Sequence, residues 1–165
     1  MFDSFLEALA IKKEPEVVAA ADGELIPLRS VPDEVFSSGM MGEGVAIRTT
    51  GAEVVSPIEG TLTMLFPTAH AFGITASNGT EVLVHVGLDT VNLKGKGFKK
   101  LADRGQHVKR GTPVLKVDWP FLSKHGFEPI VITIFSKVGG GGKYEPMSDG
   151  PAIAGKTEIV RRVMS

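Results

Sequence analysis

The sequence predicts an all-β protein, an antiparallel β-sandwich or barrel-like fold with a few short helical turns. Apolar and β-branched runs of four to seven residues alternate with turn signals along most of the 165 residues. Such regular spacing of short strands is typical of sandwiches and barrels. Twenty glycines and ten prolines supply the turns between them.

Ten segments are expected to be strands because each is apolar or β-branched and lies between turn-forming residues. They are residues 17–20, 24–28, 45–48, 53–56, 61–66, 70–76, 80–86, 113–118, 130–135 and 158–164. Asp22-Gly23, Glu59-Gly60, Asn78-Gly79 and the run Gly139–Gly142 are among the turns that separate them.

Helical periodicity is confined to short stretches. Residues 98–103 and 119–126 are expected to be helical turns, and apolar residues at i, i+3, i+4 and i+7 from Phe2 predict a weak N-terminal helix. Residues 1–16 are therefore interpreted as a flexible or weakly amphipathic leader, and 17–165 as one domain. The leader has no basic excess, so we expect at most a peripheral membrane contact through residues 1–11.

The composition excludes several classes of function. The net charge is −1 and no run of Lys and Arg exceeds two residues, so no nucleic-acid partner is expected. The absence of cysteine excludes disulfides, thiol nucleophiles and cysteine–metal sites, and it suits the reducing cytoplasm. No apolar run approaches the roughly 20 residues of a membrane span. We interpret the chain as a cytoplasmic protein.

One expected strand carries a histidine where burial would place another valine. If Asn78-Gly79 is a two-residue type I′ turn, Phe72 pairs with His85 across the hairpin. Side chains alternate across a strand, so this register puts His70 on the same face, diagonal to His85, with Cα atoms roughly 7–8 Å apart. The hairpin therefore predicts a histidine pair.

Four uses of such a pair are open. A strand histidine is most often structural, bonded through its ring to nearby backbone. A zinc site is a second use, but two imidazoles leave zinc short of its usual three or four protein ligands. Residues 85–89 match the His-x-x-x-Asp ligand spacing of one group of zinc endopeptidases, but those enzymes also need a His-x-His pair, which this chain lacks. A serine hydrolase would need a nucleophile elbow, which is missing. In a phosphohistidine site, one ring attacks phosphorus and the other binds the phosphoryl oxygens. His107 and His125 lie in polar turns and are expected to be solvated.

The chain contains five segments in one order: VPDEVFSSGMMGEGVAI (31–47), VVSPIEGTL (54–62), FPTAHAFGI (66–74), EVLVHVGLDTVNLKGKGF (81–98) and GQHVKRGTPVLKVD (105–118). Together they resemble the glucose-type enzyme IIA of the bacterial sugar phosphotransferase system, with the best match over about residues 27–138. The resemblance implies an antiparallel β-sandwich, which agrees with the turn spacing.

The resemblance also implies a role for each residue near the pair. His85 matches the phosphorylated histidine, His70 the second active-site histidine, and Thr68 the threonine that orients the ring of His70. Gly87 is expected to leave room for the phosphoryl group. No cofactor is required. Some relatives hold zinc between these histidines when docked on a regulated enzyme, so zinc at His70 and His85 is expected to be weak or completed by a partner.

A docking rim around the histidines is implied as well. Its expected members are the apolar Val35, Phe36, Met40, Met41 and Phe66 and the acidic Asp33 and Asp89. Methionine adapts to different partners, and acidic residues would attract a basic carrier. Leu83 and Val86 stand where some relatives carry phenylalanine, and Ser136-Lys137 replaces an acidic residue of some relatives, which is expected to alter one end of the docking face.

Two functions of different classes remain. In the first, the protein accepts a phosphoryl group from HPr on His85 and passes it to an enzyme IIB domain of a glucose-type sugar permease. In the second, a regulatory binding module retains the fold and docks on metabolic enzymes or permeases according to its phosphorylation. The joint presence of His70, His85, Thr68 and Asp89 favours the first. A zinc-dependent hydrolase is the least favoured.

Overall fold

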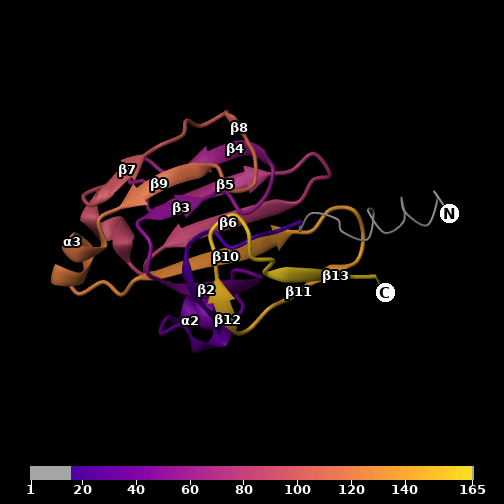
Figure 1. The fold of residues 1–165 in the computed structure, drawn as a ribbon, viewed down its shortest axis with the longest axis horizontal. Helices are drawn as coiled ribbons and strands as arrows, with labels where there is room; N and C mark the ends of the chain where they lie inside the picture. Colours follow the sequence, from indigo (N-terminus) through magenta and orange to yellow (C-terminus); the bar gives the residue numbers. More distant parts are fainter. Residues whose placement is uncertain (1–15, 165) are drawn as a thin grey trace.

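The structure is a computed structural model that describes residues 16–164. Its antiparallel sheets pack as a sandwich, with two short helices, α2 (Glu34–Ser37) and α3 (Trp119–Lys124), at the periphery (Figure 1). This confirms the predicted fold class. The expected leader helix lies outside the described residues, and within residues 16–164 no helix is long and apolar enough to cross a membrane.

The main sheet has eight strands in the order β12-β1-β2-β10-β6-β5-β4-β8. In that order they are Gly150–Ala152, Gly23–Pro27, Glu43–Thr49, Ile130–Lys137, Glu81–Val86, Ala71–Thr75, Gly60–Leu65 and His107–Val108. A three-stranded sheet contains β3 (Glu53–Val55), β9 (Pro113–Val117) and β7 (Phe98–Lys100), and β11 (Lys143–Pro146) pairs with β13 (Val160–Val163). The 3-10 turns are η1 (Leu28–Ser30) and η2 (Thr90–Leu93).

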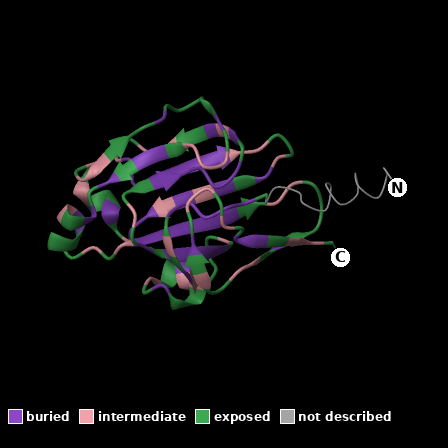
Figure 2. Cartoon of the chain, viewed as in Figure 1, coloured by how far each residue is buried: buried purple, intermediate pink, exposed green. Residues whose placement is uncertain are grey.

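The central strand β10 is buried along most of its length (Figure 2). Alternation along this strand divides its buried residues between two clusters. Val131 and Phe135 belong to the large core that joins the main sheet to the smaller sheets. Ile130, Ile132 and Ile134 point the other way, into a small cluster that also contains Val31 and Phe36. Because His85 pairs with Ile132, its side chain lies on the side of the small cluster.

Several expected elements differ in the structure. Residues 98–103 begin with β7 and form no helix, because Phe98 to Lys100 pair with β9. Residues 17–20 are buried but make only an isolated bridge, between Val18 and Glu158. The expected turn at 119–126 is confirmed as α3, with Asp118 accepting a hydrogen bond from the Phe121 amide. Helix α2 and the short strands β8, β11 and β12 were not expected.

The β5–β6 hairpin also differs from the predicted register, by one residue. Ala71, instead of Phe72, pairs with His85. The loop spans three residues: Ala76 and Thr80 are joined by a backbone hydrogen bond of 2.8 Å, and Gly79 adopts a φ of +91°. A left-handed glycine at this position is typical of three-residue loops. Phe72 is consequently 0% exposed in the large core and does not share the face of His85.

We predict that Thr133→Val stabilises the protein. Thr133 is fully buried in β10, and its hydroxyl has no hydrogen-bond partner among the described residues. Valine keeps the shape and removes a buried polar group, so the free energy of unfolding should rise by about 1 kcal/mol. Urea unfolding measures this.

The matched control is Thr49→Val. The Thr49 hydroxyl is also buried, but it donates to the Asp22 carbonyl oxygen at 2.6 Å. This substitution should lower the free energy of unfolding by about 1 kcal/mol, because it removes that hydrogen bond and leaves the Gly51 amide, which donates to the Thr49 hydroxyl at 3.1 Å, without its acceptor. An equal loss of stability in both variants would contradict the prediction.

Candidate functional site

Two histidines lie side by side at the ends of β5 and β6. The ring centroids of His70 and His85 are 5.1 Å apart, and their planes meet at 79°. His70 directly precedes β5, and Ala69 before it has a left-handed φ of +57°. The alternation of the strand therefore does not fix the direction of the His70 side chain. The rings meet as expected, although the register used to predict it was wrong.

The His85 ring is oriented by a backbone carbonyl. Its Nδ1 lies 2.7 Å from the carbonyl oxygen of Gly87. A carbonyl can only accept a hydrogen bond, so in the neutral ring Nδ1 carries the proton and donates it. Nε2 then keeps a free lone pair, and it is the nucleophilic nitrogen of this ring.

The position of that carbonyl depends on a tight turn over residues 86–90. The Gly87 amide donates to the Ile130 carbonyl at 2.7 Å, and the buried Thr90 hydroxyl donates to the Val86 carbonyl at 2.5 Å. Gly87 has a φ of +74°, and a Cβ there would lie 2.5 Å from Cγ2 of Thr90. Only glycine fits. Gly87 was expected only to leave room for the phosphoryl group. The structure shows that its carbonyl also accepts the hydrogen bond from His85.

Thr68 holds the ring of His70. Its Oγ1 lies 2.5 Å from Nδ1 of His70, in the pairing that the resemblance implied. When the hydroxyl donates to Nδ1, the ring proton remains on Nε2, which can then donate to an anionic group. Phe66 packs edge-on against the same ring, with centroids 5.1 Å apart.

Burial disfavours the charged form of both rings. Desolvation, with a further contribution from the neighbouring His85, lowers the pKa of His70 to about 4. Desolvation also lowers the pKa of His85, whereas its bond to the Gly87 carbonyl and the charges of Asp33 and Asp89 act in the opposite direction. Both rings are therefore mainly neutral at pH 7, as a nucleophilic imidazole requires.

Comparison with known proteins identifies the family. The family model described as phosphoenolpyruvate-dependent sugar phosphotransferase system, EIIA 1, matches residues 15–139. The chain belongs to this EIIA family. A glucose-specific EIIA component of Staphylococcus epidermidis is 44% identical over 132 residues, which cover 78% of this chain and 80% of the relative. A glucose-specific EIIA component of Staphylococcus aureus is 37% identical over 158 residues, which cover 94% of this chain and 93% of the relative.

A solved structure agrees with this assignment. The glucose permease IIA from Mycoplasma capricolum superposes with a TM-score of 0.82 at 36% identity, and the match covers 91% of this EIIA chain and 97% of that chain. The β-sandwich predicted from the turn spacing is thus also the fold of this relative.

The expected docking rim of this EIIA chain is only partly exposed. Its exposed apolar members are Val35, Met40 and Met41, with exposed fractions of 47%, 79% and 42%. Phe36 is buried, and its ring centroid lies 5.0 Å from that of His85. Phe36 therefore forms a wall of the histidine site instead of a rim. Phe66 is half-buried against His70.

The two acidic members serve the site in different ways. Asp33 caps α2 by accepting a hydrogen bond from the Val35 amide at 2.9 Å. Asp89 is exposed and lies at the N-terminal end of η2 with a left-handed φ of +60°. The charges of both carboxylates oppose the lowering of the His85 pKa. Asp33 thus has two roles: its carboxylate caps the helix that carries Phe36, and its charge acts on the pKa of His85.

Two expected departures do not lie at the site. Val86 is fully buried in the large core, so it has no place in a rim. Lys137 pairs with Glu81, four residues along β6 from His85, and Ser136 donates to the Glu81 carbonyl at 3.2 Å. At about 3.3 Å per residue this is about 13 Å from His85. Ser136-Lys137 therefore lies away from the histidine pair, and the expectation that it alters one end of the docking face stays a prediction.

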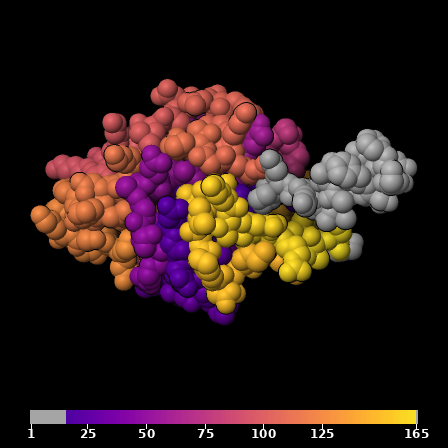
Figure 3. Space-filling view, viewed as in Figure 1, coloured from indigo at the N-terminus to yellow at the C-terminus, as the bar shows by residue number. Residues whose placement is uncertain are grey.

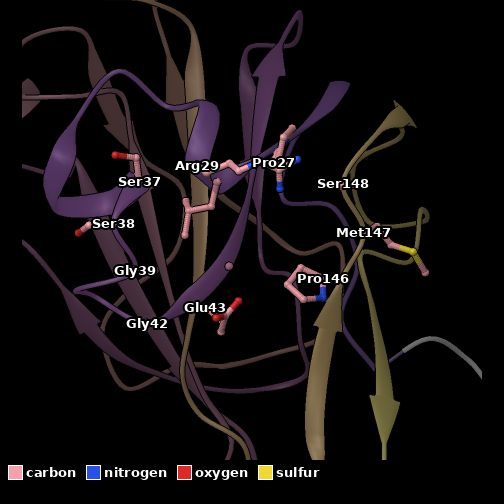
Figure 4. Close-up of a pocket in the computed structure, with 12 residues that line it drawn as sticks. Pro27, Arg29, Ser37, Ser38, Gly39, Gly42, Glu43, Pro146, Met147 and Ser148 are labelled. Atoms are coloured by element: carbon pink, nitrogen blue, oxygen red, sulfur yellow. The ribbon is translucent and has the colours of Figure 1, made fainter.

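The remaining candidate groups lie apart from the pair. His107 is exposed and 3.0 Å from Glu59, and the His125 ring donates to the Phe121 carbonyl at 2.9 Å. A hollow of about 330 Å³ beside α2 is lined by η1, the start of β2 and the segment after β11, and it includes no histidine (Figure 4). Among residues 16–164 no group of three or more His, Cys, Asp and Glu could hold a metal ion.

Sequence reasoning missed one residue of the site and expected another in a different place. Thr90, which was not singled out, fixes the turn behind His85, and Phe36, which was expected in the rim, covers the ring. A usable signal for Thr90 was its place in the Gly-x-Asp-Thr sequence, where a hydroxyl can bond to a preceding carbonyl. The contact of Phe36 has no local signal, because α2 reaches β6 only through the tertiary fold.

We predict that the stability of the protein falls between pH 6.5 and about 4 partly because of His70. In this window the unfolded chain binds a proton at His70 that the folded protein disfavours, so the free energy of unfolding decreases as the pH falls. Urea unfolding of His70→Gln across this window should show a shallower pH dependence. His125→Gln, which removes an exposed ring, should keep the slope of the wild type; an unchanged slope in His70→Gln would refute the assignment.

Proposed function

We propose that this EIIA chain is a phosphoryl carrier that forms phospho-His85 at Nε2. The observation that carries the proposal is the hydrogen bond between His85 Nδ1 and the Gly87 carbonyl, which leaves Nε2 unprotonated. The lowered pKa of the ring and its position beside a second histidine support the same chemistry. Membership of the EIIA family supplies the context of sugar phosphotransfer.

The proposed transfer needs no separate base, because the attacking nitrogen carries no proton. Nε2 of His85 attacks phosphorus and forms the N–P bond while the bond from phosphorus to the donor breaks, and the electron pair returns to the donor. The Nδ1 proton stays on His85, shared with Gly87. The second ring, His70, donates from Nε2 to the phosphoryl oxygens. The added negative charge raises the pKa of His70, so protonation of that ring can follow.

HPr is the proposed donor and an enzyme IIB domain of a glucose-type permease the proposed acceptor, with the reaction in the cytoplasm. The exposed Val35, Met40 and Met41 offer an apolar contact next to the site, since an exposed apolar patch usually marks an interface. The acidic Asp33 and Asp89 would attract basic groups on the incoming carrier.

Replacement of each histidine should have a different effect on transfer. His85→Gln should abolish phosphorylation from phosphoenolpyruvate through enzyme I and HPr. His70→Gln should still accept phosphate but pass it on roughly 100-fold more slowly, because the second ring stabilises charge that develops in the transition state. Labelling and rapid-quench kinetics with each protein measure both half-reactions.

His125→Gln is the matched control, since it removes an exposed imidazole that contacts Phe121 instead of the pair, and it should keep wild-type rates. Persistent label in His85→Gln would overturn the assignment of the nucleophile. Equal losses of both half-reactions in His70→Gln would overturn the role of the second ring.

We propose that the isolated protein does not hold a structural zinc ion. The imidazoles of His70 and His85 can supply only half of a tetrahedral zinc site, and a partner would have to complete it. The isolated protein should therefore bind zinc weakly and unfold at the same temperature with and without a chelator. Stoichiometric zinc that survives dialysis against a chelator would contradict this.

A further inference from the structure

The small net charge of the chain conceals a strong asymmetry. Residues 91–126 contain nine Lys and Arg but only two acidic residues, a net charge of +7. The rest of the chain contains nine basic and seventeen acidic residues, a net charge of −8. A charge imbalance of this size between parts of one chain suggests an interaction with a charged surface.

The fold gathers this positive segment in one place. Residues 91–126, here called the lysine lobe, contain β7, β8, β9 and α3. β7 and β9 pair in the three-stranded sheet and α3 lies at the left end of the view, whereas β8 lies at the top, beside β4 at the edge of the main sheet (Figure 1). In the space-filling view the coral and orange atoms of the lobe form a continuous region at the upper left (Figure 3). Basic runs that are short in the sequence thus become a broad basic surface.

The exposed lysines of the lobe form no close ion pairs among the described residues. They are Lys94, Lys96, Lys99, Lys100, Lys109, Lys116 and Lys124. Lys99 lies directly opposite Lys116 in the β7–β9 pairing, and Glu53 lies opposite Lys116 on its other side, in the β3–β9 pairing. One carboxylate thus stands beside two ammonium groups, so an external anion would relieve the remaining repulsion.

The composition of the lobe points to a diffuse anionic surface as its partner. Seven of its nine cations are lysines, which act as point charges, whereas arginine is the residue suited to discrete bidentate recognition on a protein. Apolar groups stand among the lysines: Leu101 is 39% exposed, and Phe98 and Pro120 line a shallow hollow together with Lys99 and Lys116. Basic side chains with interspersed apolar ones are typical of proteins that lie on anionic membranes.

We propose that the lysine lobe binds the anionic surface of a lipid bilayer. The lobe begins beside the histidine site, because a side chain at Gly95 would lie 3.8 Å from the Thr68 carbonyl oxygen. Binding through the lobe therefore holds the histidine pair close to the membrane. The proposal does not depend on phosphotransfer, and its test requires none.

The test is co-sedimentation of the full chain with vesicles of phosphatidylcholine, alone or mixed with phosphatidylglycerol. The lobe variant replaces Lys96, Lys99, Lys116 and Lys124 by Gln. The control variant replaces Lys137, Lys143, Lys156 and Arg161 by Gln, which removes the same charge from exposed positions outside the lobe. Both variants retain residues 1–15, and circular dichroism verifies that both are folded.

Wild type and control should bind the mixed vesicles and not the neutral ones, and salt near 0.5 M should release them. The lobe variant should bind at least tenfold more weakly, since each lysine near an anionic surface adds to the attraction. Absence of wild-type binding, wild-type affinity in the lobe variant, or equal losses in both variants would each overturn the proposal. Binding to poly-glutamate without binding to vesicles would show that the lobe recognises an acidic polypeptide instead.

Discussion

The chemistry of this site depends on one hydrogen bond, from Nδ1 of His85 to the carbonyl oxygen of Gly87 at 2.7 Å. A histidine at the end of a strand could adopt either tautomer and several ring orientations. The carbonyl selects one tautomer and one orientation, because it offers only an acceptor. The turn behind it exists because Gly87 tolerates a φ of +74° and Thr90 bonds to the Val86 carbonyl. The backbone turn thereby fixes the direction in which Nε2 of His85 presents its lone pair.

Burial provides the second condition. The small cluster around Ile132 and the ring of Phe36 exclude water from one side of His85. Desolvation lowers the pKa of both histidines, to about 4 at His70, whereas at His85 the bond to the Gly87 carbonyl and the charges of Asp33 and Asp89 oppose the lowering. The two rings are thus inequivalent: in the proposed transfer, His85 is the nucleophile and His70 gains a proton when negative charge arrives.

Turn chemistry and strand alternation were sufficient to predict the sandwich and most of its strands. They failed where one turn sequence was compatible with two loop lengths. Asn78-Gly79 fits a two-residue loop, but the chain places Gly79 in the left-handed position of a three-residue loop, which shifts the register by one. The histidines nevertheless meet, because His70 lies outside the regular strand. Phe72 was consequently assigned to the wrong face.

Other features required the tertiary fold. The contact between Phe36 and His85 joins segments about fifty residues apart, and the basic surface of the lysine lobe arises only when β7, β9 and α3 pack together. The resemblance supplied the identities of the site residues, but it also placed the buried Phe36 and Val86 at an exposed rim. Burial depends on what covers a residue, and single positions in a sequence do not carry that information.

The tautomer of His85 tests the central claim most directly. Long-range proton–nitrogen correlation spectra of the unphosphorylated protein at pH 7 report which ring nitrogen carries the proton. A neutral His85 protonated at Nδ1, with Nε2 showing the shift of an unprotonated nitrogen, is the result that this account predicts. A ring protonated at Nε2, or an imidazolium at that pH, would contradict it, because neither leaves the lone pair that phosphoryl transfer at Nε2 requires.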